Sequence, residues 1–194
     1  MTARDSLSDI TGVILVGGKS RRMGQDKVLF NIDGIPLISI IHSRLESLFN
    51  RVLVIGHHRP EFDNLNIQSH SDIIPDRGAL GGIYTGLVLS TTPCVFAVAG
   101  DMPHVDQDLM VEIASQREGN DAVIPRGPSG MEPLFALYSQ TCRDPIRENL
   151  ETGQLKILKA LHGLRVAKPR INPPDDGSPD PLINLNTPED LENL

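Results

Sequence analysis

The stretch over residues 15–27 contains glycines and cations at a spacing that suits phosphate binding. It follows the apolar residues 13–16, which predict a short buried strand. Glycines let backbone N–H groups approach an anion closely, and arginine and lysine supply positive charge for phosphate oxygens. The stretch matches neither the Walker A loop nor the GxGxxG fingerprint. It nevertheless predicts a site for a nucleoside triphosphate, with these candidate ligands: Gly17, Gly18, Arg22 and Lys27.

Two of the cations have a defined task if the reaction is nucleotidyl transfer, in which positioning and electrostatic stabilisation dominate. Lys27 would bind triphosphate oxygens, and Arg22 would help to hold the departing pyrophosphate. Lys19 and Arg21 are explained equally well as solvated surface charges. We therefore treat Arg22 and Lys27 as the catalytic cations.

A carboxylate follows the most apolar strand of the sequence. Residues 94–99 are continuously apolar, and Asp101 comes two residues later, before Met-Pro. Mg²⁺ favours one or two carboxylates together with phosphate oxygens and water. Asp101 is therefore the candidate Mg²⁺ ligand and a catalytic residue, and the alternative is an aspartate that caps the loop or the next helix.

A second glycine-rich segment begins at Asp76. Asp76 could receive a ribose hydroxyl, a base donor or a metal-bound water, and ordinary turn chemistry is the alternative. Gly81 and Gly82 would let the backbone approach the nucleotide or the acceptor. His104 is a weaker candidate for a general base. Residues 57–59 could contact a base, but they fit a surface loop better.

Strands and helices alternate along the chain. The expected strands cover residues 12–16, 51–56, 94–99, 121–125, 133–138 and 183–186. The expected helices cover residues 36–49 (with Pro36 first), 83–89, 140–150 and 154–162, and two more follow the caps Asp106 and Thr187. This alternation predicts a three-layer α/β/α domain with a mainly parallel, Rossmann-like sheet. Ligands bind at the carboxyl ends of such strands, where the basic loop and Asp101 both lie.

Composition narrows the function classes. The 194 residues are enough for a single domain over residues 1–194, with residues 1–10 as a loose tail. The formal net charge of −7 argues against a nucleic-acid binder. The two distant cysteines, Cys94 and Cys142, indicate neither a disulfide framework nor a zinc site. Because residues 1–10 lack a signal-peptide pattern and no apolar run has membrane length, we expect a cytoplasmic protein that does not contact a membrane.

Four motifs resemble, in the same order, those of the molybdenum cofactor guanylyltransferases. Residues 15–27 resemble the family's Gly-Gly-x-Ser-x-Arg-Met-Gly-x-Asp-Lys signature, and residues 77–82 resemble its Gly-Pro-Leu-x-Gly segment. Residues 99–103 are similar to its metal-binding aspartate segment, and residues 184–191 to its Asn-x-Asn-Thr-Pro-Glu-Asp-Leu motif. The resemblance implies a GT-A-like nucleotidyltransferase fold. It also implies transfer of GMP from Mg-GTP to the terminal phosphate of molybdopterin or Mo-molybdopterin, with release of pyrophosphate.

The resemblance further implies roles for single residues. Leu15, Val16 and Gly17 would lie on the guanine and ribose side, and Asp101 would bind both GTP and Mg²⁺. Taken with the loop chemistry above, the expected nucleotide-binding set is Leu15, Val16, Gly17, Gly18, Lys27, Asp76 and Asp101. Two asparagines near the C-terminus fall where the family places its pterin-side residues. The expected acceptor-binding set is Gly81, Gly82, Asn184 and Asn186.

The sequence departs from the family pattern at two places. Val16 replaces the usual Ala, which is a small change. Residues 55–59, after the second strand, lack the Asn that usually helps to hold the nucleotide, so base contacts from this loop are left open. The Leu-Val-Gly-Gly string at residues 15–18 favours GTP over the CTP that related cytidylyltransferases use.

Two alternatives to a guanylyltransferase follow from the same residues. One is a cytidylyl- or sugar-phosphate nucleotidyltransferase on the same fold, against which residues 23–27 argue. The other is a non-catalytic carrier of GTP or molybdopterin, against which Lys27 and Asp101 together argue. The Pro/Asp-rich loop over residues 172–181 offers a place for transient contact with cofactor-biosynthesis proteins or acceptor molybdoenzymes, but it identifies none.

Overall fold

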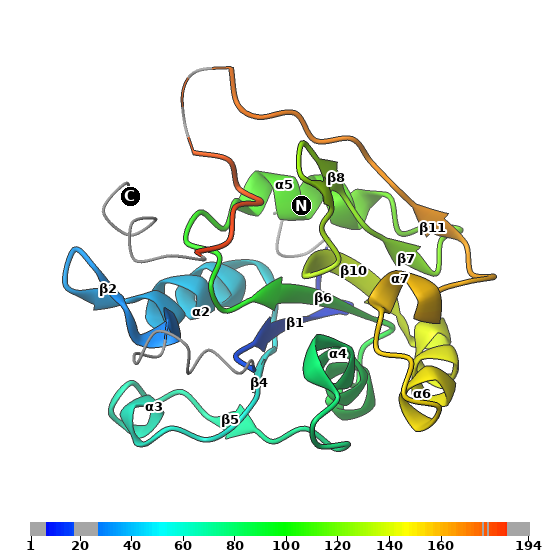
Figure 1. The fold of residues 1–194 in the computed structure, drawn as a ribbon. Coiled ribbons are helices and arrows are strands. Elements are labelled where there is room, and N and C mark those ends of the chain that lie inside the picture. The colour runs from blue at the N-terminus through cyan, green and yellow to red at the C-terminus, as the bar shows by residue number, and fades with distance from the viewer. Residues whose placement is uncertain (1–6, 18–26, 176, 178, 186–194) are drawn as a thin grey trace.

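A seven-stranded sheet forms the centre of the computed structural model, which describes residues 7–17, 27–175, 177 and 179–185 (Figure 1). In spatial order its strands are β11 (Val166–Ala167), β7 (Ala122–Val123), β10 (Phe135–Ser139), β6 (Cys94–Ala99), β1 (Ile10–Leu15), β4 (Val52–Ile55) and β5 (Ser69–His70). Only β10 runs antiparallel to its two neighbours, and the other pairs are parallel. The predicted mainly parallel sheet is therefore confirmed, with β10 as its antiparallel strand.

Helices cover both faces of this sheet, as Figure 1 shows. On one face, α2 (Leu37–Leu48) and α5 (Gln107–Ser115) pack into one buried apolar cluster. On the other face, α4 (Gly78–Leu89), α6 (Arg143–Glu151) and α7 (Ile157–Ala160) pack into a second cluster. Strand residues alternate between the two clusters because successive side chains of a strand point to opposite faces. This is the predicted three-layer α/β/α arrangement.

Smaller elements connect the layers. They are the 3₁₀ helices η2 (Lys27–Leu29) and η3 (Gln140–Cys142), the short helix α3 (Pro60–Asn64), and two hairpins. The hairpins pair β2 (Asn31–Ile32) with β3 (Ile35–Pro36), and β8 (Arg126–Gly127) with β9 (Gly130–Met131). In the part of the chain described here, no helix is long and apolar enough to cross a membrane.

The structure corrects several local expectations. The predicted loose tail is wrong at its end, because Leu7 is only 1% exposed and Ile10 already belongs to β1. Pro36 ends β3 and caps α2 instead of opening the helix, because it pairs with Asn31 in the hairpin. α4 begins at Gly78, before the expected start at residue 83, and the helix expected over residues 154–162 is shortened to α7.

The predicted strand over residues 183–186 is also wrong where the structure describes it. Residues 183–185 have no strand pairing. Instead, the N–H of Leu185 donates a hydrogen bond of 2.9 Å to the carbonyl of Asp101. The segment therefore makes its backbone hydrogen bond with the residue that follows the end of β6, and not with a strand of the sheet. The helix expected after Thr187 lies outside the described residues.

The strand order places a cleft at the carboxyl ends of β1 and β6. β1 pairs with β4 on one side and β6 on the other, so the chain changes direction across the sheet at β1. Loops that leave neighbouring strands in opposite directions open a crevice there. Gly100 keeps the two strand ends close: its N–H donates to the Leu15 carbonyl at 2.9 Å, and a Cβ on Gly100 would lie 3.1 Å from that oxygen.

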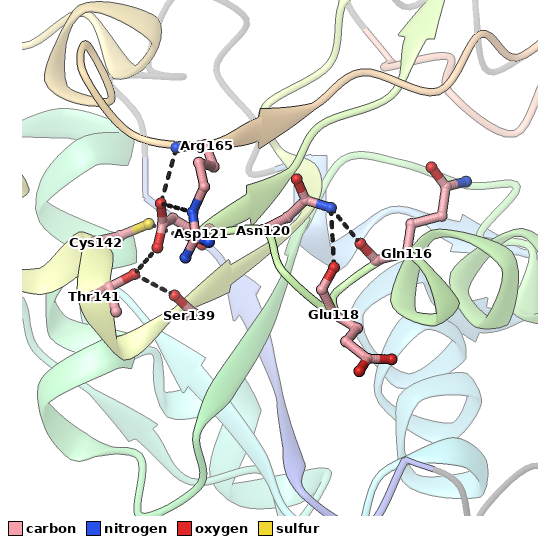
Figure 2. Close-up of polar contacts among 8 residues, drawn as sticks. All are labelled: Gln116, Glu118, Asn120, Asp121, Ser139, Thr141, Cys142 and Arg165. Atoms are coloured by element: carbon pink, nitrogen blue, oxygen red, sulfur yellow. Dashed lines mark hydrogen bonds and ion pairs between the residues drawn. The ribbon is translucent and has the colours of Figure 1, made fainter.

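A buried carboxylate, that of Asp121, connects the segments around β7 and β11, near one edge of the sheet (Figure 2). Asp121, just before β7, is 8% exposed and accepts hydrogen bonds from the Arg165 backbone N–H and from Thr141 Oγ1, each of 2.8 Å. The Arg165 guanidinium Nε lies 3.4 Å from the same carboxylate, and Cys142 Sγ donates to the Asp121 carbonyl. Asp121 thus links the segments that lead into β7, β11 and α6.

Candidate active site

A cavity occupies the cleft and has an empty volume of about 680 Å³, including space open to solvent. Its lining comes from the ends of β1 and β6, from η2, from the β4–α3 connection and from the start of α4. Six of the predicted site residues line it: Leu15, Val16, Gly17, Lys27, Gly82 and Asp101.

Lys27 and Asp101 are brought together by the backbone of Leu185. Lys27 is 9% exposed, and its Nζ donates a hydrogen bond of 2.6 Å to the Leu185 carbonyl. The backbone N–H of Leu185 in turn donates to the carbonyl of Asp101. Leu185 therefore bonds to the ammonium group of Lys27 and to the backbone of Asp101, the two residues that the sequence predicted as catalytic.

The surroundings of the Asp101 carboxylate suit the binding of a cation. Burial raises the pKa of Asp101 above its ordinary value, while the Lys27 ammonium and the backbone N–H of Asp101 lower it in part. Among the described residues, no group of three or more His, Cys, Asp or Glu side chains could enclose a metal ion. Mg²⁺ needs no such cage, because it is bound by one or two carboxylates together with substrate phosphates. The donor set at Asp101 fits that mode of binding.

A second acidic side chain, Glu132, lies near this pair and was not anticipated from the sequence. Its carboxylate accepts the Leu134 N–H at 3.2 Å and the Asn184 side-chain amide at 3.4 Å. Burial raises the pKa of Glu132, the two hydrogen bonds lower it, and the negative charge of Asp101 raises it further. Leu134 lines the first cavity, so Glu132 marks its boundary on the side of the β8–β9 hairpin.

A neighbouring cavity begins at Glu132. It has an empty volume of about 640 Å³ and lies between the β8–β9 hairpin and residues 180–184. The predicted acceptor residue Asn184 lines it, through the same side chain that binds Glu132. Asn184 therefore lines this second cavity, and its neighbour Leu185 bonds to both Lys27 and Asp101.

The first cavity is also lined by two charged residues outside the predicted site set, Asp72 and Arg59, and Arg59 belongs to the segment 57–59 for which a surface loop was preferred over a base contact. Oδ1 of Asp72 is buried and has no hydrogen-bond partner among the described residues. Burial raises the pKa of Asp72, and His57 lowers it in part. A polar atom without a partner, facing a cavity, is suited to a ligand. No motif in the sequence marked Asp72, which follows β5 (Ser69–His70) by two residues.

Other predicted residues are placed elsewhere. Asp76 is exposed in the turn before α4 and does not line the cavity. Gly81 is buried in α4, and a Cβ added to it would lie 2.9 Å from the Cβ of Arg77. It does not line the cavity. His104 is outside the cavity lining, and burial together with Arg44 lowers its pKa. Three further predicted residues lie outside the described part of the chain: Gly18, Arg22 and Asn186.

A cavity at the point where a parallel sheet changes direction, with Asp101 just after β6 and Lys27 at the start of η2, is typical of the ligand sites of α/β proteins. Residues 12–166 match the model of the MobA-like NTP transferase domain. The chain belongs to this family of nucleotidyltransferases.

Curated relatives agree over nearly the whole chain. A protein of Natronomonas pharaonis named "Probable molybdenum cofactor guanylyltransferase" is 33% identical over 196 residues and is covered, like this chain, to 96%. A protein of Desulfosudis oleivorans named "Molybdenum cofactor guanylyltransferase" is 32% identical, with 94% of this chain and 93% of the relative covered.

A solved structure shows the same fold. Molybdopterin-guanine dinucleotide biosynthesis protein A from Archaeoglobus fulgidus superposes with a TM-score of 0.78 at 24% identity, covering 94% of this chain and 95% of that one. The GT-A-like nucleotidyltransferase fold that the motifs implied is therefore confirmed.

Proposed function

We propose that this protein transfers GMP from Mg-GTP to the terminal phosphate of molybdopterin or Mo-molybdopterin. The acceptor phosphate oxygen attacks the α-phosphorus of GTP, the bond to the β-phosphate bridging oxygen breaks, and pyrophosphate leaves. The names of the relatives support this reaction, and they do not favour the cytidylyl, sugar-phosphate or carrier alternatives.

The observation that carries the proposal is the placement of Lys27 and Asp101 on either side of Leu185, between two cavities. In phosphoryl-type transfer, fixed charge around the phosphate accounts for most of the catalysis. Lys27 would bind the triphosphate, and Asp101 would lie where the α-phosphate and the acceptor meet. Arg22 remains a predicted ligand of the leaving pyrophosphate.

The nucleoside would lie over the end of β1. Leu15, Val16 and Gly17 supply a wall and backbone groups, and Gly18 remains a predicted contact. Asp76 stays a predicted contact, but the cavity lining favours Asp72 for the polar role that we assigned to it.

Asp101 would hold the divalent cation, which we propose to be Mg²⁺. A cation bound there would offset the charge of the triphosphate and polarise the α-phosphate. Lys27 and Asp101 interact electrostatically, and the partly buried setting strengthens such interactions.

The acceptor would occupy the cavity between the β8–β9 hairpin and residues 180–184. Asn184 lines this space, and Gly82 lies in the wall of the nucleotide cavity. Gly81 and Asn186 remain predicted acceptor residues. We propose that the chain acts as one nucleotidyltransferase domain. A cytoplasmic location, transient contacts with partner proteins, and the absence of nucleic-acid and membrane binding stay predictions.

The reaction is tested by supplying molybdopterin or Mo-molybdopterin, Mg²⁺ and each of the four nucleoside triphosphates in turn, and measuring pyrophosphate release. The proposal expects release with GTP only. Preference for CTP would assign the chain to the cytidylyl branch, and release with none of the four, from folded protein and intact acceptor, would contradict a catalytic role.

A further inference from the structure

The nucleotide cavity has two charged ends. Four of its lining residues have ionisable side chains: Lys27, Arg59, Asp72 and Asp101. Lys27 and Asp101 belong to the end where the phosphates were placed above. Apolar or small residues line the space between the ends, among them Leu15, Ile55 and Gly82. Arg59 and Asp72 therefore form a second polar region that the transfer chemistry does not use.

The strand order places this second region where a base would lie. Asp101 follows β6, and Arg59 and Asp72 follow β4 and β5, which lie on the other side of β1. The side chain of Arg59 reaches back to the end of β1, where it bonds to the Val16 carbonyl. A nucleotide whose phosphates lie at Asp101 can therefore extend its base across β1 toward Arg59.

Arg59 is held rigidly in the cavity wall. Its Nη2 donates to the Val16 carbonyl at 2.9 Å, and its Nη1 donates to the His57 carbonyl at 3.0 Å. Its guanidinium carbon lies 5.2 Å from the ring centre of Phe62, which is fully buried. A guanidinium fixed by two carbonyls and one ring is pre-organised, so little conformational entropy is lost when it binds a ligand.

We propose that Arg59 determines the specificity for guanine, by donating hydrogen bonds to O6 and N7 of the base. This inference rests on the proposed function. Guanine alone among the four bases presents those two acceptors side by side, whereas adenine has an amino donor beside N7 and pyrimidines lack N7. The residue would also compensate for the asparagine that residues 55–59 lack. Arg59 is thus a binding residue that the motifs did not indicate.

Equilibrium binding without acceptor tests this assignment. Dissociation constants are measured in Mg²⁺ for GTP, 7-deaza-GTP and ATP, because 7-deaza-GTP lacks only the N7 acceptor. The protein should bind GTP at least about fivefold tighter than 7-deaza-GTP. In Arg59→Ala and Arg59→Lys that preference should fall to about one, because neither side chain presents the fork. Arg51→Ala, which alters an exposed arginine at the other end of β4, should keep the preference.

Three results would overturn the inference. The first is an equal affinity of the unaltered protein for GTP and 7-deaza-GTP, which needs no variant and no assumption about folding. The second is a preference that persists in Arg59→Ala. The third is a loss of affinity by the same factor for all three nucleotides, which would mean that Arg59 acts by holding the Val16 carbonyl. Failure of the unaltered protein to bind GTP at all would instead contradict the proposed function.

Discussion

Asp101 and Asp121 are both aspartates beside strands of the central sheet, but their surroundings are opposite. Asp121 accepts hydrogen bonds from Arg165 and Thr141, and these bonds hold its pKa below the ordinary value. Asp101 receives no hydrogen bond from the side chain of another described residue, and burial raises its pKa. A carboxylate whose oxygens are already satisfied has a structural role, whereas one that burial leaves short of partners is available for a ligand.

Their positions in the sheet agree with this division. Asp121 lies just before β7, where this strand meets β11, and β10 separates β7 from the β1–β6 cleft (Figure 2). Asp101 lies at the cleft itself and lines the cavity. The comparison makes opposite predictions for the two aspartates: substitution of Asp101 should affect catalysis, and substitution of Asp121 should affect stability.

The largest expected effect is on the activity of Asp101→Asn. Loss of the carboxylate removes the proposed cation ligand, so kcat/KM for GTP should fall at least about 1000-fold. Burial raises the pKa of Asp101, so the charged form destabilises the fold at neutral pH. The variant should therefore unfold at the same temperature or a higher one. Pyrophosphate release and thermal unfolding measure the two effects. A large loss of stability would contradict the proposed difference in role between Asp101 and Asp121.

Lys27→Met should have the next largest effect. It removes the cation beside Asp101, and we expect kcat to fall about 100-fold. It also leaves the Leu185 carbonyl without the Nζ donor, which should cost about 1 kcal/mol of unfolding free energy. Steady-state kinetics and urea unfolding separate these effects. Lys27→Arg keeps the charge and should recover part of the rate; no recovery would argue that the geometry at Leu185 matters more than charge.

Asp121→Asn should lower the free energy of unfolding by about 2 kcal/mol at pH 7, because charge-assisted hydrogen bonds from Arg165 and Thr141 are weakened. The folded pKa of Asp121 is lowered, so its stabilisation is present above the unfolded pKa of about 4 and is lost as the pH falls through the folded value. The difference between the two proteins should therefore shrink toward acid. Urea unfolding at several pH values tests this, with kcat per folded molecule unchanged.

The smallest expected effect is that of Thr141→Val. It removes one of the donors to Asp121 while keeping the shape of the side chain, and should cost about 1 kcal/mol. In a double-mutant cycle with Asp121→Asn, the double variant should lose less stability than the sum of the two single losses, because both substitutions act on the same hydrogen bond. Full additivity would contradict the network in Figure 2.

The predictable part of the site consists of residues whose chemistry shows in consecutive positions. Lys27 closes a glycine-basic string and Asp101 closes an apolar strand, so a short stretch of sequence revealed each of them. The layers and the mainly parallel sheet were predictable for the same reason, because periodicity along the chain marks each strand and helix. The confirmed elements are therefore those with a strong local pattern.

The remaining part depends on tertiary placement. Asp76 adjoins glycines and was the obvious candidate, but Asp72 is the residue whose side chain reaches the cavity. Arg59 and Glu132 arrive there through the order of β4 beside β1 and through the return of the β8–β9 hairpin, which no local pattern shows. Leu185 acts through backbone groups, which every residue has, so its type gave no signal.

The central claim is that Lys27 and Asp101 support transfer of the GMP moiety. The most direct measurement uses two GTP samples, one labelled at the α-phosphorus and one at the γ-phosphorus, with Mg²⁺ and molybdopterin. The account predicts that the α label enters the acceptor, that the γ label is released as pyrophosphate, and that Asp101→Asn abolishes both. Label from the γ-phosphorus in the acceptor, or α label released only as free GMP or GDP, would contradict guanylyl transfer.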